Sequence, residues 1–205
     1  MPITPPPPET GLLLDALAVL VAYLIGAFPT GYLVVKQMTG QDIRTIGSGG
    51  TGATNVRRVA GGKAALFVLL VDFHKGLIPV VVGKLLFPGE PWLHVIMALM
   101  AVIGHSKSIF IRFGGGKSAA TGLGTLIGLA PLPALLVGAI AYGMTKWSRY
   151  QSVGSMTASI AAPLFIYLFG APVPYVVYAA ITAIYVIYLH KANIQRLLNG
   201  TENPL

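Results

Sequence analysis

Seven apolar segments separated by short polar stretches constrain this chain more than any other feature. They cover residues 12–35, 64–86, 92–104, 119–129, 132–144, 153–169 and 173–189. Only 10% of the residues are charged, whereas a soluble domain has about a quarter. A helix that crosses a bilayer needs about 20 apolar residues. The sequence therefore predicts an all-α, polytopic membrane protein with one integral membrane domain over residues 12–205, preceded by a disordered tail over residues 1–11.

The Lys and Arg residues gather mainly in four polar stretches, at residues 36–63, 107–117, 146–149 and 191–196. The positive-inside rule puts such stretches in the cytoplasm, so an even number of passes must separate them. Residues 119–129 and 132–144 are then two short passes that meet at "APLP". We expect about seven transmembrane helices, with the N-terminus outside and the C-terminus cytoplasmic. A five-pass arrangement with residues 119–146 as a re-entrant hairpin has the same sidedness and stays open.

The net charge and the absence of cysteine limit which ligands and which catalytic groups the protein can use. The net charge is +8 and there is no cysteine, which excludes disulfides, thiol catalysis and cysteine-ligated metals. Nucleic acid is a poor candidate partner because no basic run is long and the aromatic residues lie in apolar stretches. Membrane lipids and phosphorylated substrates are better candidates.

A glycine-rich stretch, "GSGGTGATNVRR" at residues 47–58, predicts an anion site. Its glycines, including Gly49 and Gly52, let the backbone turn amides toward an anion. Ser48 and Thr54 add hydroxyls, and Arg58, with Arg57 beside it, is suited to grip phosphate. Thr54 or Asn55 is a candidate helix cap. A flexible linker with its arginines on lipid head groups is the alternative.

A second glycine stretch, "FGGGKSAATG", begins at Phe113. It is not a Walker A loop, because the residue five before Gly116 is Ile111 rather than glycine. Gly115, Gly116 and Lys117 still predict close backbone approach and one cation for a phosphate. His105 precedes this loop and is expected to cap or to donate a hydrogen bond.

Polar residues at three-residue spacing mark two further stretches. Arg149, Ser152 and Ser155 would lie along one side of a helix, although positive-inside topology alone also explains their region. His190, Asn193 and Arg196 would share one side of a short terminal helix that Asn199–Gly200 closes. An interfacial amphipathic helix is the alternative reading of that segment.

Asp72 and Lys75 lie inside the second apolar segment, where ionisable side chains are costly to bury. At three-residue spacing they can pair on one helix face. The pair would either line a polar cavity or neutralise itself structurally.

Together "GSGGTGATNVRR", "DFHKG", "GHSKSIFIRFGGGKSAATGLG", "RYQSVGS" and "HKANIQRLLNGTEN" resemble the bacterial acyl-phosphate:glycerol-3-phosphate acyltransferase family. The resemblance runs from about residue 20 to residue 203. It implies a seven-helix enzyme of the bacterial inner membrane with its active site facing the cytoplasm. The enzyme would move a fatty acyl group from acyl phosphate to the 1-hydroxyl of glycerol 3-phosphate, giving lysophosphatidic acid and phosphate for phospholipid biosynthesis. No cofactor and no metal are expected.

The resemblance also implies roles for individual residues. His190, Asn193, Lys117 and Arg58 would be catalytic, and Asp72, Lys75 and Glu202 would support them. The residues expected to bind substrate phosphate are Ser48, Gly49, Gly52, Thr54, Asn55, His105, Gly115, Gly116, Arg149, Ser152 and Ser155. The chain departs from the usual family pattern at Gly50, Thr51, Gly114, Ser118 and Leu189.

The histidines indicate how the acyl group would move. None has an aspartate five residues later, which the other membrane acyltransferase class uses, and no serine has an evident triad setting. We therefore expect direct displacement without an acyl-enzyme, with either His190 or a substrate phosphate as the base. A membrane transporter of a phosphorylated solute and a lipid-binding structural protein are the rival functions. The sequence leaves oligomeric state and acyl-chain preference open.

Overall fold

The structure, a computed structural model, describes residues 8–205, so residues 1–7 of the expected tail lie outside it. Over the described residues the chain forms nine α-helices and two short 3-10 turns, η1 (Ile43–Thr45) and η2 (Ile109–Ile111). The α-helices are α1 (Pro8–Ala27), α2 (Thr30–Thr39), α3 (Ala53–Leu86), α4 (Pro91–Ser106), α5 (Ala119–Leu129), α6 (Pro131–Ser148), α7 (Gln151–Leu168), α8 (Val173–Leu189) and α9 (Lys191–Leu198). The all-α prediction is confirmed, and α1 begins inside the segment expected to be a tail.

Each of the seven expected apolar segments is helical, but the first is broken. Proline lacks a backbone N–H, and Pro29 lies between α1 and α2. The stretch 11–39 and α3 are each long and apolar enough to cross a membrane, and α8 with α9 passes the same test as a pair bent by 57°. Helices α4 and α5 are apolar but shorter.

The "APLP" sequence separates two helices, as expected. Ala130 has non-helical dihedrals, and Pro131 starts α6 in its first turn, where proline is favoured. Residues 119–144 therefore do not form one continuous helix. Whether α5 and α6 each cross the bilayer stays a prediction.

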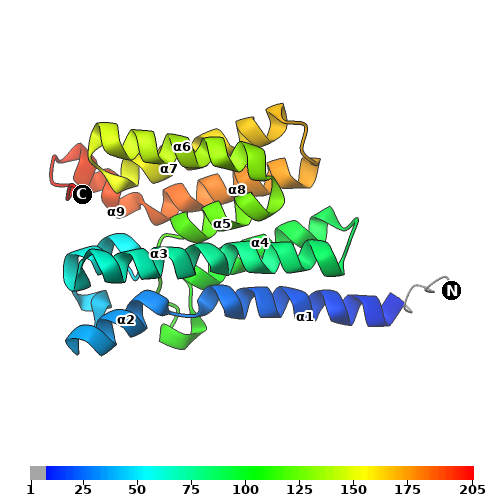
Figure 1. The fold of residues 1–205 in the computed structure, drawn as a ribbon, viewed down its shortest axis with the longest axis horizontal. Helices are drawn as coiled ribbons and strands as arrows, with labels where there is room; N and C mark the ends of the chain where they lie inside the picture. Colours follow the sequence, from blue (N-terminus) through cyan, green and yellow to red (C-terminus); the bar gives the residue numbers. More distant parts are fainter. Residues whose placement is uncertain (1–7) are drawn as a thin grey trace.

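The helices form two layers with α5 between them (Figure 1). The lower layer holds α1, α3 and α4, and the upper layer holds α6, α7 and α8. The principal packing pairs are α3 with α5, α1 with α4, α6 with α7 and α7 with α8. The loop before α3, the turn between α6 and α7, and α9 lie at the same end, on the left of Figure 1. This end collects three of the four basic stretches.

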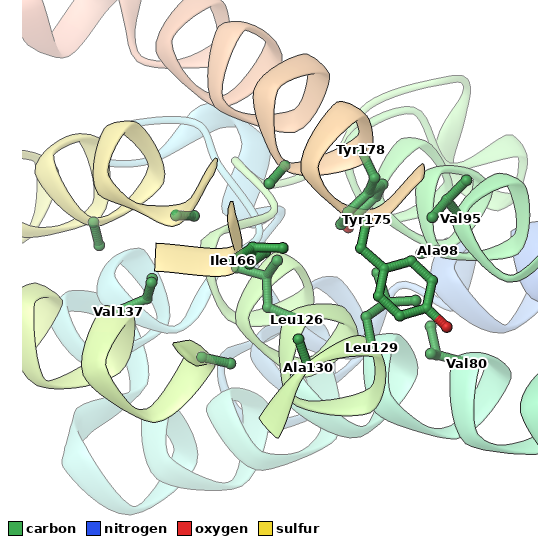
Figure 2. Packing of buried hydrophobic residues seen from close by; sticks show 14 residues of the cluster. Val80, Val95, Ala98, Leu126, Leu129, Ala130, Val137, Ile166, Tyr175 and Tyr178 are labelled. Atoms are coloured by element: carbon green, nitrogen blue, oxygen red, sulfur yellow. The ribbon is translucent and has the colours of Figure 1, made fainter. Parts of the chain in front are cut away.

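Close backbone contact fixes α5 against α3. A Cβ at Gly76 would lie 2.0 Å from the carbonyl oxygen of Thr121, and one at Gly124 would lie 2.0 Å from that of Phe73. Small residues allow such approach between membrane helices. Beyond this contact, Val80, Leu126, Ile166 and Tyr178 join both layers in one apolar cluster (Figure 2). Lys117 lies just before α5, so the same contact also anchors the end of its loop.

Candidate active site

A cavity of about 790 Å³ opens between the two layers and combines two kinds of lining. Its polar end carries hydroxyl, amide and charged side chains, namely Ser48, Thr54, Arg58, Lys117, Ser152, Ser155, His190, Asn193 and Glu202. Its other limb is apolar, with Leu123, Leu126, Val137, Ala158, Ala162, Ala179 and Ala183. Helix α8 runs along this limb, and its rise of about 1.5 Å per residue puts Ala179 about 16 Å from His190. The cavity suits an amphiphile with an anionic head.

The first glycine stretch is organised around the buried side chain of Asn55. Its Nδ2 donates to the carbonyl oxygens of Ile46 and Gly50, both at 3.0 Å, and its Oδ1 accepts from the Ser48 amide at 3.2 Å. Because these bonds occupy the side chain, Asn55 shapes the loop. The amide of Gly49 also turns inward, donating to Ile46 at 3.1 Å, so the expectation that it faces an anion is wrong.

Helix α3 begins at Ala53 with Gly52 as its N-cap, so the predicted caps, Thr54 and Asn55, are wrong. The first amides of a helix have no intrahelical acceptor and carry partial positive charge. Those of Ala53 and Thr54 belong to residues that line the cavity. In this stretch, the amides suited to bind an anion are therefore those of Ala53 and Thr54 at the helix start, and not that of Gly49.

In the second glycine stretch the glycines serve packing. The amide of Gly116 donates to the His105 carbonyl oxygen at 3.1 Å, and a Cβ there would lie 2.2 Å from His105 Nε2. A Cβ at Gly115 would lie 2.3 Å from the same carbonyl oxygen. The expectation of a cradle of free glycine amides is therefore wrong for Gly116, and Gly115 does not line the cavity. The close approach sets the position of Lys117.

Ser118 adopts a left-handed conformation with φ of 58°. This conformation costs energy for a residue with a side chain. The hydroxyl of Ser118 donates to the Val102 carbonyl oxygen at 2.8 Å, which offsets part of that cost. Helix α5 begins immediately after it, and Ala119 and Ala120 bring a second helix start to the cavity.

Lys117 belongs to a network at the polar end. Its Nζ donates to Asn193 Oδ1. The carboxylate of Glu202 accepts from Asn193 Nδ2, from Ser152 Oγ at 3.0 Å and from Arg196 Nε at 2.7 Å. Burial lowers the pKa of Lys117 to about 8, helped by nearby Arg196 and opposed by Glu202. A phosphate at Lys117 would meet a cation that begins to lose its proton just above neutral pH.

The carboxylate of Glu202 stays charged within this network. Burial alone would raise the pKa of Glu202, but hydrogen bonds from Asn193, Arg196 and Ser152 outweigh burial and lower it. Helix α9 ends as predicted at Asn199 and Gly200, with the Thr201 amide bonded to the Arg196 carbonyl oxygen at 2.8 Å. This turn directs Glu202 back into the site.

His190 lies between α8 and α9 and is buried beside Lys117. Its Nδ1 is 2.8 Å from the Val186 carbonyl oxygen and so carries the proton, leaving Nε2 as an acceptor. Burial lowers the pKa of His190 to about 4, against the effect of the bond to Val186. The imidazole is therefore neutral at physiological pH and is a weak base.

Arg149 does not share a helix side with Ser152 and Ser155. It follows α6 with a φ of 65°, and α7 begins only at Gln151, so the predicted i, i+3, i+6 arrangement is wrong. Ser152 and Ser155 line the cavity, whereas Arg149 is exposed outside it. A helix cannot pass through a left-handed residue without breaking.

Asp72 and Lys75 form the expected pair, with Nζ and Oδ1 2.7 Å apart. Asp72 lines the cavity, and His105 Nδ1 lies 3.7 Å from its carboxylate. Lys75 also donates to the carbonyl oxygen of Phe28, at the break between α1 and α2. The Phe28 carbonyl oxygen also accepts from the Thr30 amide at 3.0 Å, so Lys75 adds a second hydrogen bond that ties α3 to this break. Both expectations for the pair therefore hold: Asp72 lines the cavity, and the ion pair with Lys75 neutralises the two buried charges.

Two residues at the site were not predicted from the sequence. Thr145 lies in the last turn of α6, is 8% exposed, and lines the cavity. The carbonyl oxygen of Asn203 accepts from Arg58 at 3.2 Å and draws the C-terminal segment over the polar end. Both depend on helix packing across long sequence separations.

The fold and the cavity define a class of protein, an integral membrane protein with a cavity that joins a cationic polar end to an apolar limb. The family model for glycerol-3-phosphate acyltransferase matches residues 16–200. A glycerol-3-phosphate acyltransferase of Rippkaea orientalis is 45% identical over 199 residues, covering 92% of each chain. One of Halalkalibacterium halodurans is 45% identical over 195 residues, covering 92% of this chain and 94% of the relative.

Two solved structures are also similar to this chain. A crystal structure of PlsY (YgiH), an integral membrane glycerol 3-phosphate acyltransferase, in its glycerol 3-phosphate form has a TM-score of 0.90 and 38% identity, covering 94% of this chain and 96% of that chain. The lysophosphatidic acid form has a TM-score of 0.87 and 36% identity, covering 94% and 95%. The chain belongs to the glycerol-3-phosphate acyltransferase family and is a membrane acyltransferase.

Proposed function

We propose that this protein transfers a fatty acyl group from acyl phosphate to the 1-hydroxyl of glycerol 3-phosphate, in bacterial phospholipid biosynthesis. The products are lysophosphatidic acid and inorganic phosphate. The observation that carries the proposal is the single cavity in which cations and helix starts meet an apolar limb. Related crystal structures in glycerol 3-phosphate and lysophosphatidic acid forms support the acceptor and the product. The motif resemblance supports the acyl phosphate donor.

The polar end supports direct displacement. The acceptor hydroxyl oxygen attacks the acyl carbon, the new ester bond forms, and the bond from the acyl carbon to the phosphate oxygen breaks. Proximity of the bound reactants contributes about 7–11 kcal/mol to such a step. Lys117 and Arg58, with the α3 and α5 starts, would hold phosphate and stabilise the charge that develops. An acyl phosphate brings its own leaving group, so no acyl-enzyme is required.

The pKa of His190 indicates which group takes the proton of the acceptor hydroxyl. A weak base with a pKa of about 4 is poorly matched to take the hydroxyl proton at neutral pH. We assign His190 Nε2 the task of accepting a hydrogen bond from the acceptor, with Asn193 beside it. The proton then goes to a phosphate oxygen, which becomes part of the product. This assigns His190 to orientation and a substrate phosphate to proton acceptance.

Sidedness follows from the basic stretches. Three of them lie at the end of the molecule that holds the polar part of the cavity (Figure 1). The positive-inside rule places that end in the cytoplasm, where glycerol 3-phosphate is available. We therefore propose a multi-pass protein of the bacterial inner membrane whose active site faces the cytoplasm.

The test uses purified protein in lipid nanodiscs with glycerol 3-phosphate and either acyl phosphate or acyl-CoA. We expect equal amounts of phosphate and lysophosphatidic acid with acyl phosphate only. No product with acyl phosphate would overturn the proposal, and product from acyl-CoA alone would replace the donor. Trapping an acylated protein during turnover would refute direct displacement. A transporter would instead move labelled glycerol 3-phosphate across sealed vesicles without forming lipid.

A further inference from the structure

Helix α3 is interrupted at Gly61. The dihedral angles of this residue are φ 85° and ψ 177°, while the other residues of α3 are helical. Essentially only glycine adopts this combination, since a Cβ would collide with the adjoining backbone. Beyond the local helix and the two chain neighbours, no atom of residues 8–205 lies within 4 Å of the place where a Cβ at Gly61 would be. The backbone conformation, and not close packing, therefore requires glycine here.

The break divides α3 into two parts with different neighbours. The first part, residues 53–60, is here called the α3 arm. Its buried Val56 belongs to an apolar cluster with α2 and η1, and its Asn55 is bonded to the loop before α3. The second part reaches the same cluster at Ala64, but its main contact is with α5, where Gly76 approaches the backbone closely. Both parts are therefore held by their neighbours, and Gly61 sets the angle between them.

The lining that α3 gives the cavity changes at the break. From the α3 arm, Thr54, Arg57 and Arg58 line the cavity, together with the helix start. After the break, most of the lining residues of α3 are small or apolar, such as Leu66 and Leu69. The arm thus carries the part of α3 that suits a phosphate, and the direction of the arm decides where that part lies.

Arg58 is the group most sensitive to the direction of the α3 arm. It lies three residues before Gly61 and is exposed, so packing around it does not fix its position. Its guanidinium donates to the Asn203 carbonyl oxygen at 3.2 Å. Because Asn55 and Val56 hold the start of the arm, a change at Gly61 falls mainly on the residues between, which include Arg58. Gly61→Ala would favour a φ of about −63° over the present 85°, and this change would redirect Arg58.

We propose that Gly61 is a positioning residue for the acyl transfer reaction. The break that it makes in α3 directs the α3 arm so that Arg58 reaches a substrate phosphate at the polar end of the cavity. Gly61 does not line the cavity, so it acts only through the arm. The inference rests on the proposed function for one point, which is the phosphate-binding task of Arg58.

The first test is a double-mutant cycle on full-length protein in nanodiscs. Arg58→Gln removes a charge-assisted hydrogen bond and Gly61→Ala misplaces the same group, so each should lower kcat/KM for glycerol 3-phosphate about tenfold or more. With Arg58→Gln already present, Gly61→Ala should lower it less than about threefold, because the group that it misplaces is gone. Full additivity would overturn the proposal, and so would an unchanged kcat/KM in Arg58→Gln.

Two glycines outside the cavity are matched controls. Gly40, which ends α2, has a φ of 71°, and Gly143 lies inside α6. Within residues 8–205, a Cβ at either would meet no atom within 4 Å beyond its local backbone, as at Gly61. Gly40→Ala should lower the unfolding temperature as Gly61→Ala does, since both force a side chain into a positive φ, but should leave kcat/KM unchanged. Gly143→Ala should lower neither quantity.

An equal loss of kcat/KM in Gly40→Ala and Gly61→Ala would overturn the proposal, because backbone strain alone would then explain the loss. If Gly61→Ala does not fold, the same cycle is run with Gly61→Asn, since asparagine enters positive φ more readily than alanine.

Binding of inorganic phosphate, followed by ³¹P NMR without turnover, separates this inference from the proposed function. Gly61→Ala and Arg58→Gln should each weaken binding, and the double variant should weaken it no further than Arg58→Gln alone. Weaker binding in Arg58→Gln but not in Gly61→Ala would overturn the positioning role and leave the proposed function intact. Because no acyl donor is present, the result does not depend on whether acyl phosphate is the donor.

Discussion

Replacing Glu202 by glutamine tests the network that holds Lys117 and Asn193. Glu202 is 9% exposed, and its Oε2 accepts from Arg196 Nε at 2.7 Å while its Oε1 accepts from Ser152 and Asn193. A glutamine oxygen can keep the bonds on the Oε1 side. Its amide nitrogen would then face the Arg196 donor, so that one charge-assisted bond is lost.

The size of the effect follows from that geometry. A hydrogen bond to a charged group contributes about 1.5–3 kcal/mol, so we expect kcat/KM for glycerol 3-phosphate to fall about 10- to 150-fold. The charge change has a second consequence. Glu202 raises the pKa of Lys117 against the larger effect of burial. Without this carboxylate the pKa of Lys117 should fall further below its present value of about 8.

The assay is kcat/KM for glycerol 3-phosphate measured on either side of about pH 8. Because Lys117 must keep its proton to attract phosphate, activity should decline as pH rises through the pKa of the free enzyme. In Glu202→Gln this decline should begin at lower pH. The matched control is Glu90→Gln, an exposed carboxylate that precedes α4 and does not line the cavity. A reduced rate with an unshifted alkaline decline would refute the coupling between Glu202 and Lys117.

Two further substitutions address the loop and the histidine. Gly116→Ala puts a Cβ 2.2 Å from His105 Nε2 and should cost about 1–3 kcal/mol of stability in thermal unfolding. The control is Gly50→Ala, which should change the unfolding temperature little because the atom nearest to its added Cβ is 3.7 Å away. Equal losses of stability in the two variants would contradict the packing argument. His190→Ala should lower kcat about 5- to 150-fold through loss of one orienting hydrogen bond, whereas a general base contributes up to about 10⁴. A loss near that upper figure, measured in single-turnover reactions, would restore His190 as the base.

The helices were predictable because the bilayer requires long apolar segments whatever their neighbours are. The break between α5 and α6 was also visible, since proline at Pro131 favours a helix start. The split of the first segment at Pro29 was not predicted, although proline disfavours a helix interior. There Lys75, distant in sequence, adds a hydrogen bond to the Phe28 carbonyl, which also accepts from the Thr30 amide. Rules that consider only neighbouring residues cannot predict this contact between Lys75 and Phe28.

The candidate site was predicted in its residue types and only partly in their tasks. Lys117, His190, Asn193 and Glu202 were expected together; all four line the cavity, and hydrogen bonds join Lys117, Asn193 and Glu202. Gly116 was expected to cradle an anion, but its amide is bonded to His105. A glycine that binds an anion and a glycine that admits a neighbouring helix look alike in a sequence, because both only lack a side chain.

The sequence by itself determined that this chain is a helical membrane protein, which family it resembles, and which polar residues gather near one end. Hydropathy, charge placement and motif order are properties of the chain that need no partner. The tertiary structure alone decided that Arg149 lies outside the cavity, that Asn55 shapes a loop, and that Thr145 is buried and lines the cavity. These outcomes depend on contacts between residues far apart in sequence, and only the packed helices bring those residues together.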